Sequence, residues 1–172
     1  MTGFVLRRAG VADAAAIADI HCRSRQSTYR GLLPDDYLDR RLPAEIGPFW
    51  EALLRELARG AGEALLAERD GAPIAFVCVM APDAEGGAYV DALHADPRRK
   101  GEGAGSALLE AATRWARERG ARWMHLLVVE GNEAAMRFYE LRGWRRGERV
   151  HDTGHGMDTP AIRFELALAP QA

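Results

Sequence analysis

The 172-residue sequence is poor in several features that would mark particular classes of protein. It has two cysteines, Cys22 and Cys78, and their spacing fits neither a metal site nor a redox motif. A reducing compartment suits them best. The longest apolar run, Ile74 to Met80, is too short to cross a bilayer. These shortages argue against a disulfide-stapled secreted protein and against a membrane-spanning one.

Positive charge is also in short supply. The chain carries 23 Lys and Arg against 25 Asp and Glu, a formal net charge of −2. A general nucleic-acid binder needs an excess of cations to neutralise phosphates, so no nucleic-acid partner is expected. No secretory leader is expected either, because the stretch from Met1 to Leu6 is too short. We therefore expect a cytoplasmic protein without a membrane partner.

What is present is an alternation of strand-like and helical segments over residues 1–172, with no internal repeats and no long linker. A single domain is therefore expected. Asp70-Gly71 predicts a tight hairpin, Asp13 and Asn132 are candidate helix caps, and Gly120 and Gly143 are candidate helix ends. The segment WMHLLVV is so apolar that we expect a strand covered on both faces. Strands are expected near 4–8, 88–96, 123–129, 144–150 and 161–168, with two more over 63–80 joined at Asp70-Gly71. Helices are expected near 14–24, 35–42, 48–60, 103–119 and 132–142. The predicted fold class is α/β: a mixed sheet flanked by helices on both faces.

One segment concentrates glycine and positive charge. Residues 96–110 read DPRRKGEGAGSALLE, with three glycines in five positions directly before a helix. Exposed N–H groups and the positive dipole end of a helix bind phosphate groups. The segment therefore predicts an anion site at the start of this helix, unless the glycines merely make a flexible loop.

Two other phosphate-binding motifs fit less well. A P-loop needs Gly-Lys-Ser/Thr after its glycines, which is missing here. A dinucleotide fingerprint starting at Gly101 would place Ser106 at its third position, with Glu130 as the ribose-binding acid. However, the residues from Asp96 to Lys100 separate the strand from the glycines, whereas that fold turns at once. A dinucleotide-binding oxidoreductase stays the weaker alternative.

The segments HADPRRKGEGAGSALL and VVEGNEAAMRFYELRGW together resemble the GNAT superfamily of acyl-CoA-dependent N-acyltransferases. The family signature, Gln/Arg-x-x-Gly-x-Gly/Ala, maps onto Lys100, Gly103 and Gly105. The order of elements from residue 4 to 168 and the stretch STYRGLLPDDYLD add to the resemblance. It implies a mostly antiparallel sheet of six to seven strands, an acetyl-CoA-binding core over 88–143 and acceptor-side helices over 24–60.

The resemblance also implies which residues hold acetyl-CoA, the expected co-substrate. The loop amides would bind the pyrophosphate, and the strand before them would pair with the pantetheine arm and polarise the thioester carbonyl. No metal is implied. The cofactor-binding residues expected on this basis are Leu93, His94, Ala95, Lys100, Gly101, Glu102, Gly103, Ala104, Gly105, Ser106, Asn132 and Tyr139.

Two residues depart from the family pattern. Lys100 keeps the charge of the usual Gln or Arg position but loses planar donor geometry. Glu102 places a carboxylate in a loop that should meet phosphates. Binding survives if this side chain is directed outward, and weakens otherwise.

Tyr139 is the expected general acid, because it stands two turns after Asn132 as in the family's Asn–Tyr pairing. A tyrosine pKa of about 10 keeps the phenol protonated at neutral pH, so it can donate to a thiolate leaving group. The alternative is a half-buried packing tyrosine, with Asn132 as a plain helix cap.

A base must also take a proton from the attacking amine, whose pKa is about 10.4. Asp91 and His94 lie on the relevant strand but face opposite sides unless a bulge intervenes. We favour Asp91, with His21 and Tyr29 as outside candidates. Each of Asp91 and His94 is equally compatible with a purely structural role.

The expected reaction is direct transfer of an acetyl group from acetyl-CoA to a primary amine of a small molecule or a protein, without an acetyl-cysteine intermediate. A non-catalytic acyl-CoA-binding module on the same fold is the second alternative. Acids among residues 24–60 suit a cationic acceptor or simply a solvated helix face. The segment HDTGHGMD, residues 151–158, lacks a third metal ligand and is expected to be a solvated loop. A homodimer is suggested by the resemblance alone.

Overall fold

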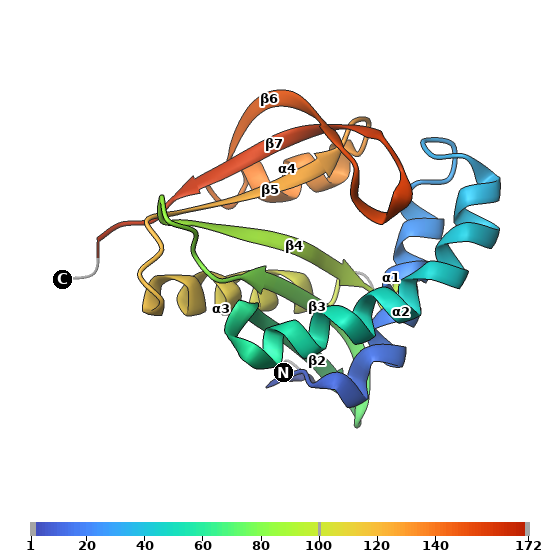
Figure 1. Ribbon diagram of the computed structural model, residues 1–172, viewed down its shortest axis with the longest axis horizontal. Coiled ribbons are helices and arrows are strands. Elements are labelled where there is room, and N and C mark those ends of the chain that lie inside the picture. The colour runs from blue at the N-terminus through green and yellow to red at the C-terminus, as the bar shows by residue number, and fades with distance from the viewer. Residues whose placement is uncertain (1–2, 100, 171–172) are drawn as a thin grey trace.

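The computed structural model describes residues 3–99 and 101–170, which form one seven-stranded sheet in the order β1-β2-β3-β4-β5-β7-β6 (Figure 1). All neighbouring strands pair antiparallel except β4 and β5, which are parallel. The expected mixed, mostly antiparallel sheet is confirmed. The strands are β1 Val5–Arg8, β2 Gly62–Arg69, β3 Ala72–Met80, β4 Gly87–Ala95, β5 Trp123–Val129, β6 Arg145–Asp152 and β7 Thr159–Ala167.

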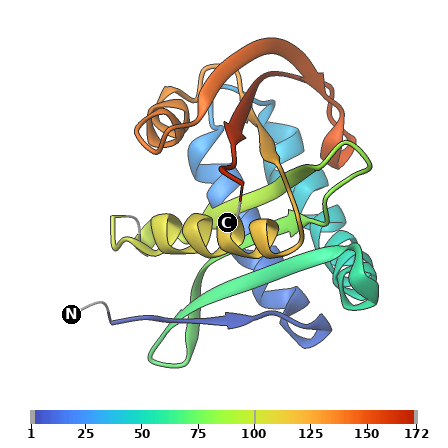
Figure 2. The same ribbon diagram turned by 90° about the vertical axis from the view of Figure 1, so that its left-hand side faces the viewer.

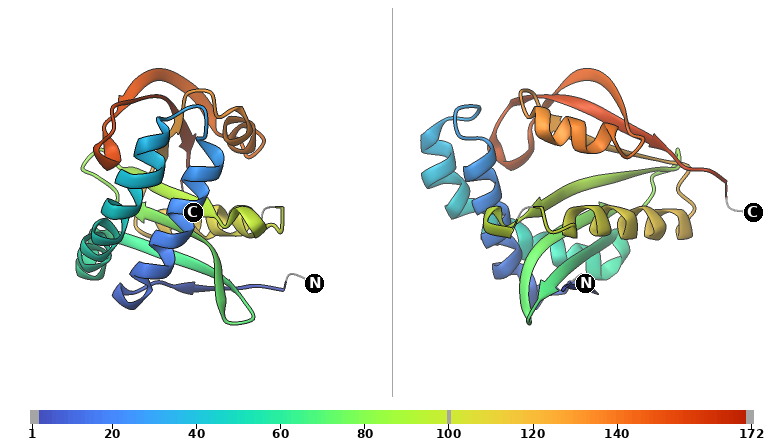
Figure 3. Two further views of the ribbon diagram at one scale, coloured as in Figure 1. Left: turned by 90° about the vertical axis from the view of Figure 1, so that its right-hand side faces the viewer. Right: turned by 180° about the vertical axis from the view of Figure 1, so that it is seen from behind.

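Four helices cover the two faces of the sheet (Figures 2 and 3). They are α1 Ala14–Thr28, α2 Leu42–Glu56, α3 Ala104–Glu118 and α4 Glu133–Glu140. Helices α3 and α4 share one apolar core with β3, β4 and β5, and α1 and α2 share a second core on the opposite face. In the described chain, none of the helices has the length and apolar character needed to cross a membrane.

The local predictions from turn residues hold in most places. Asp70 and Gly71 both have positive φ and join β2 to β3 in the expected hairpin. Gly120 and Gly143, in left-handed conformation, follow α3 and α4. Asp13, however, does not cap α1 through its side chain: its carboxylate instead accepts from the N–H of Gly10 and pairs with Arg7. The ion pair with the neighbouring strand outcompetes the local cap.

The expectation that β5 is covered on both faces is wrong. Trp123, His125 and Leu127 are only half-buried, and they alternate with the buried Met124 and Leu126. Helices α3 and α4 pack against one face of β5, whereas the apolar core of α1 and α2 includes only its last residue, Val129. A strand with one covered face shows this alternation in burial.

The sheet opens between β4 and β5. The two strands pair only from Gly87 to Tyr89, opposite Trp123 to His125. Beyond this point β5 continues to pair with β7 alone, and β4 with β3. Figure 1 shows the two strands diverging from a common end toward α1 and α2. The result is a wedge whose open end lies beside these two helices.

Candidate active site

The segment from β4 into α3 presents unpaired backbone amides. Gly101 and Gly103 have φ of +83° and +85°, a conformation that only glycine adopts without strain. Gly103 is the residue before α3 and makes no side-chain cap, so the N–H groups of Ala104, Gly105 and Ser106 have no acceptor within the helix. These groups lie where the sequence predicts an anion site. The candidate Lys100 lies outside the described residues.

The open side of this loop is free of neighbouring side chains. A Cβ atom placed on Gly101 or Gly103 would meet no described atom within 4 Å. On Gly105 it would only reach Phe138, at an ordinary contact distance of 3.9 Å. The glycines are therefore required by backbone conformation at two positions, and the space beside them is available to a ligand.

Glu102, the carboxylate in this loop, is paired rather than free. Its Oε2 lies 2.5 Å from Nη1 of Arg69, at the end of β2, and its Oε1 lies 3.9 Å from Nη1 of Arg99. Its side chain is about 25% exposed. Two guanidinium groups thus offset the negative charge that the sequence places beside the amides.

Beyond Tyr89, where β4 no longer pairs with β5, some backbone N–H and C=O groups of β4 are directed into the wedge. The N–H of Asp96 donates to Ile74 of β3, at 2.8 Å. Because hydrogen-bonding direction alternates along a strand, Leu93 and Ala95 direct their N–H and C=O groups toward the wedge, and His94 directs its own toward β3. The structure therefore brings two of the three expected backbone positions to the opening.

Tyr139 and Asn132 lie on α4, on the other side of the wedge. Asn132 caps this helix, its Oδ1 accepting from the N–H of Ala135 at 3.2 Å. Its side chain also lies close enough to Tyr29, the residue after α1, to influence the pKa of that phenol. Tyr139 is 8% exposed, and burial, reinforced by nearby Tyr29, raises its pKa above the ordinary tyrosine value. The phenol is therefore protonated at neutral pH.

Asp91 occupies a bulge in β4. The pairing with β3 runs from Cys78–Ala92 to Val79–Val90, so Asp91 is the extra residue. The carboxylate is largely buried and its Oδ2 has no hydrogen-bond partner in the described chain. Burial, with a smaller contribution from the negative charge of Asp152, raises its pKa to about 6. This is a suitable value for a base that works near neutral pH.

Comparison with known proteins decides the family. The sequence model of the acetyltransferase (GNAT) family matches residues 22–144. The chain belongs to this family. It is 33% identical over 135 residues to a mycothiol acetyltransferase of Nocardiopsis dassonvillei, covering 77% of this chain but 37% of that protein, so it spans little more than a third of that relative's length.

Solved structures of GNAT proteins share the fold. PaiA N-acetyltransferase of Thermoplasma acidophilum, in complex with coenzyme A, superimposes with a TM-score of 0.80 at 20% identity, over 96% of this chain and 99% of that one. YncA of Salmonella typhimurium, with acetyl-CoA, gives a TM-score of 0.69 at 21% identity, over 99% and 96% of the two chains.

In this GNAT chain, the face of β4 toward α1 carries a group of aromatic and imidazole rings that the sequence did not reveal. His94 stacks on His21 with ring centres 4.3 Å apart, and its Nδ1 lies 2.8 Å from Oγ of Ser24. The indole N–H of Trp50 donates to Nδ1 of His21 at 2.9 Å. Burial lowers the pKa of His21 well below its ordinary value, so this ring is neutral. The bulge at Asp91 allows that carboxylate and His94 to share this side of the strand.

The segment between β6 and β7 was expected to be a solvated loop, which is wrong for His155. This ring lies 5.0 Å from that of His21 and 4.7 Å from that of Phe49, and burial lowers its pKa to about 4. The expectation holds for His151 and Asp158, which form an exposed pair at 2.8 Å, and for the exposed Thr153, Gly154 and Gly156. Within the described residues, no group of three or more His, Cys, Asp or Glu is placed to hold a metal ion.

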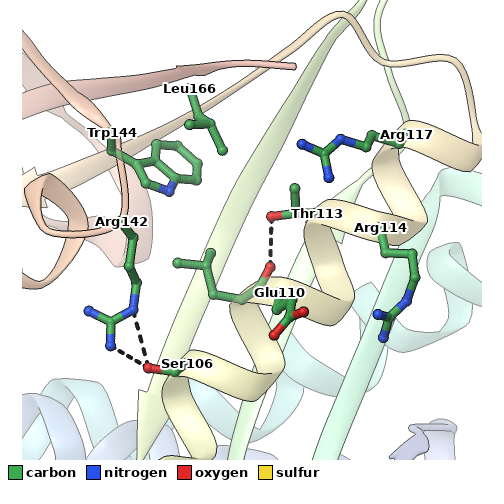
Figure 4. Close-up of a pocket in the computed structure, with 9 residues that line it drawn as sticks. Ser106, Glu110, Thr113, Arg114, Arg117, Arg142, Trp144 and Leu166 are labelled. Atoms are coloured by element: carbon green, nitrogen blue, oxygen red, sulfur yellow. Dashed lines mark hydrogen bonds between the residues drawn. The ribbon is translucent and has the colours of Figure 1, made fainter. Parts of the chain in front are cut away.

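A cavity of about 480 Å³ adjoins the first turn of α3 (Figure 4). Its lining combines apolar side chains with three arginines. Arg142, just after α4, reaches across to Oγ of Ser106 and also donates to the carbonyl of Phe138. The nine lining residues are Ser106, Leu109, Glu110, Thr113, Arg114, Arg117, Arg142, Trp144 and Leu166. The cavity runs along α3 from Ser106 to Arg117 and is closed on its other side by Arg142, Trp144 and Leu166.

Proposed function

We propose that this GNAT protein transfers the acetyl group of acetyl-CoA directly to a primary amine. The observation that carries the proposal is the combination of an open amide loop at the start of α3 with the wedge between β4 and β5. The amide loop suits a phosphate group, and the adjoining unpaired edge of β4 suits an amide-containing arm attached to that phosphate. Acetyl-CoA has both parts.

In this proposal the amides from Gly101 to Ser106 bind the pyrophosphate. The backbone of Leu93 and Ala95 pairs with the pantetheine arm as an added strand would. The same N–H groups polarise the thioester carbonyl and stabilise the negative charge that develops on its oxygen. The space next to the loop accommodates the phosphates because it is free of described side chains.

Transfer requires one bond to form and one to break. The amine nitrogen attacks the thioester carbon, and the C–S bond then breaks so that the sulfur carries the electron pair. Tyr139 donates its phenolic proton to this sulfur. Its buried position keeps it protonated until that moment. Solvent reprotonates the phenolate after the products leave.

The acceptor ammonium gives one proton to Asp91, which frees the lone pair for attack, and the nitrogen gives its second proton to solvent after the bond to carbon has formed. The carboxylate lies in the bulge of β4, on the strand that lines the wedge, with one oxygen free of described hydrogen-bond partners. With a pKa of about 6 it is ionised at pH 7 and close enough to neutrality to be protonated in the reaction. His94 then serves to hold β4 against α1 rather than as the base.

The two alternatives make different predictions. A dinucleotide-binding oxidoreductase needs a parallel sheet, whereas β4 and β5 form the one parallel pairing among the described strands. A non-catalytic acyl-CoA-binding module does not require the buried Tyr139 on one side of the wedge, nor Asp91 on the other side, whose Oδ2 has no hydrogen-bond partner in the described chain. Both features favour the enzyme.

The test is thiol release from acetyl-CoA in the presence of a panel of amines, with acetyl-CoA and NAD(P) titrations beside it. Binding of acetyl-CoA and amine-dependent thiol release support the proposal. Binding of acetyl-CoA without thiol release in the presence of any amine would indicate the non-catalytic module, and binding of NAD(P) alone would indicate the oxidoreductase.

We also propose a homodimer and a cytoplasmic location. Light scattering of the same sample tests the first, and cell fractionation tests the second.

A further inference from the structure

Arg25 of α1 is a buried cation without a counter-ion among the described residues. The residue is 8% exposed, and its Nε has no hydrogen-bond partner in the described chain. No carboxylate of the described residues lies within salt-bridge distance of it. Exposed arginines of the same region behave differently: Arg30 pairs with Asp35 and Asp39, at 3.1 and 2.8 Å.

The groups packed around Arg25 are uncharged. Its guanidinium carbon lies 5.0 Å from the ring centre of Tyr29 and 5.9 Å from that of Tyr37. Burial raises the pKa of both phenols, which are therefore neutral. Burial also lowers the pKa of His21 and His155, the two imidazoles within electrostatic range, so they do not carry charge at neutral pH either.

This arrangement leaves a large desolvation cost partly uncompensated. Removing an ion from water is costly, and a cation–π contact offsets only part of that cost. A buried guanidinium normally has a carboxylate or phosphate partner, to which it donates two parallel hydrogen bonds. The guanidinium of Arg25 is therefore suited to an anion from outside the described chain.

The position of Arg25 connects this anion to the reaction. Tyr29, which Arg25 contacts, lies near Asn132 and near enough to Tyr139 to affect the pKa of its phenol. On the same side of the sheet are two carboxylates without an ion-pair partner among the described residues, Asp91 and Asp152. Asp152 acts electrostatically on both Asp91 and Tyr29. Arg25 and Asp152 act electrostatically on the same two groups, Tyr29 and His155, so one cation and two carboxylates lie on this side of the sheet.

We propose that Arg25 binds a carboxylate of the acceptor, so that the substrate is an amino acid or a closely related amine that carries a carboxylate. The ammonium end is directed to Asp91, which takes its proton, and the carboxylate end to Arg25. This inference rests on the proposed acetyl transfer and narrows its substrate class. A polyamine or aminoglycoside does not fit, because the acids on the surface of residues 35–39 are paired with Arg30 and Arg40 and the buried charge is positive.

The experiment compares matched amines that differ only in the carboxylate. The twenty common amino acids are assayed with acetyl-CoA beside the amines that each becomes on loss of its α-carboxylate, for example phenylalanine with phenethylamine. For the pairs that react, we expect kcat/KM to be about 10²-fold higher for the carboxylated member, the usual effect of a buried charged hydrogen bond. In Arg25→Met this ratio should fall toward one, and in Arg25→Lys it should be intermediate.

A matched control lies on the same helix. Arg23 is exposed and pairs with Asp19 at 3.0 Å, so Arg23→Met should leave the ratio unchanged. If Arg25→Met does not fold, the wild-type ratio and Arg25→Lys still decide. Equal kcat/KM for both members of each pair, or acetylation of no amino acid by protein that binds acetyl-CoA, would overturn the inference while leaving CoA binding intact. Failure to bind acetyl-CoA would instead remove the proposed function itself.

Discussion

The hydroxyl of Ser24 on α1 lies 2.8 Å from Nδ1 of His94 on β4, at the part of the strand where β5 no longer pairs. His94 stacks on His21, and His21 accepts a hydrogen bond from Trp50 of α2. A strand that has lost one neighbour is thus fixed from its other face. The contact joins α1, which carries Arg25 next to Ser24, to β4, which carries Asp91.

Removing the phenolic oxygen of Tyr139 should slow the chemical step. Tyr139→Phe keeps the buried ring but leaves the departing thiolate without a proton donor, so we expect kcat to fall by about 10²-fold or more. Acetyl-CoA affinity, measured by calorimetry, should change little. Tyr89→Phe is the control, because Tyr89 lies at the closed end of the wedge beside His125. Unchanged turnover in Tyr139→Phe would remove this residue from the mechanism.

The activity should depend on ionisation of Asp91. With a pKa of about 6, kcat/KM should decrease as the pH falls below 6 and reach a plateau above it. Asp152→Asn removes the negative charge that helps raise this pKa, so the acid limb should move to lower pH. A pH profile that is the same in the wild type and Asp152→Asn would contradict the assignment. Asp91→Asn should lose most activity at every pH.

The same carboxylate should lower stability at neutral pH. Because the pKa of Asp91 is raised from 3.8 to about 6 on folding, the folded state binds the proton more tightly than the unfolded state. Its contribution to stability is present below pH 4 and is lost as the pH rises through 6. Asp91→Asn should therefore raise the free energy of unfolding at pH 7 by on the order of 2–3 kcal/mol. Denaturant unfolding at pH 4 and pH 7 measures this, and a variant less stable than the wild type at pH 7 would contradict it.

The ion pair between Arg69 and Glu102 should protect phosphate binding. Arg69→Ala leaves the Glu102 carboxylate less well neutralised beside the amide loop, and we expect acetyl-CoA affinity to fall by about fivefold at low salt. Glu102→Gln should not weaken binding, and the double variant should recover the wild-type affinity. Calorimetry on the four proteins measures the coupling. If the double variant binds as weakly as Arg69→Ala, then Arg69 acts on the ligand itself and not through Glu102.

The parts of the site that depend on local backbone chemistry could be predicted from the sequence. Gly103 before a helix and the Asn132 cap each have a cause within a few residues of the chain. The features that arise from tertiary packing could not. The stack of His21 on His94 joins residues 73 positions apart, and no motif or periodicity in the sequence predicts it. The sequence could not show whether β4 has a bulge at Asp91. That Arg25 lacks a partner for its Nε among the described residues follows only from the positions of all its neighbours.

The central claim is that the glycines before α3 bind the pyrophosphate of acetyl-CoA. A glycine at the other end of the same helix serves as the control. Gly103 and Gly120 stand at its two ends with φ of +85° and +83°, and a Cβ on either meets no described atom within 4 Å. Replacing either by alanine should therefore cost the same backbone strain, about 1 kcal/mol.

Calorimetric titration of acetyl-CoA into the wild type, Gly103→Ala and Gly120→Ala is the most direct measurement. We predict that the wild type and Gly120→Ala bind equally and that Gly103→Ala binds about tenfold more weakly or worse, because its methyl group stands where the phosphates approach the backbone. Equal affinity in all three proteins, or no binding to the wild type, would contradict the account.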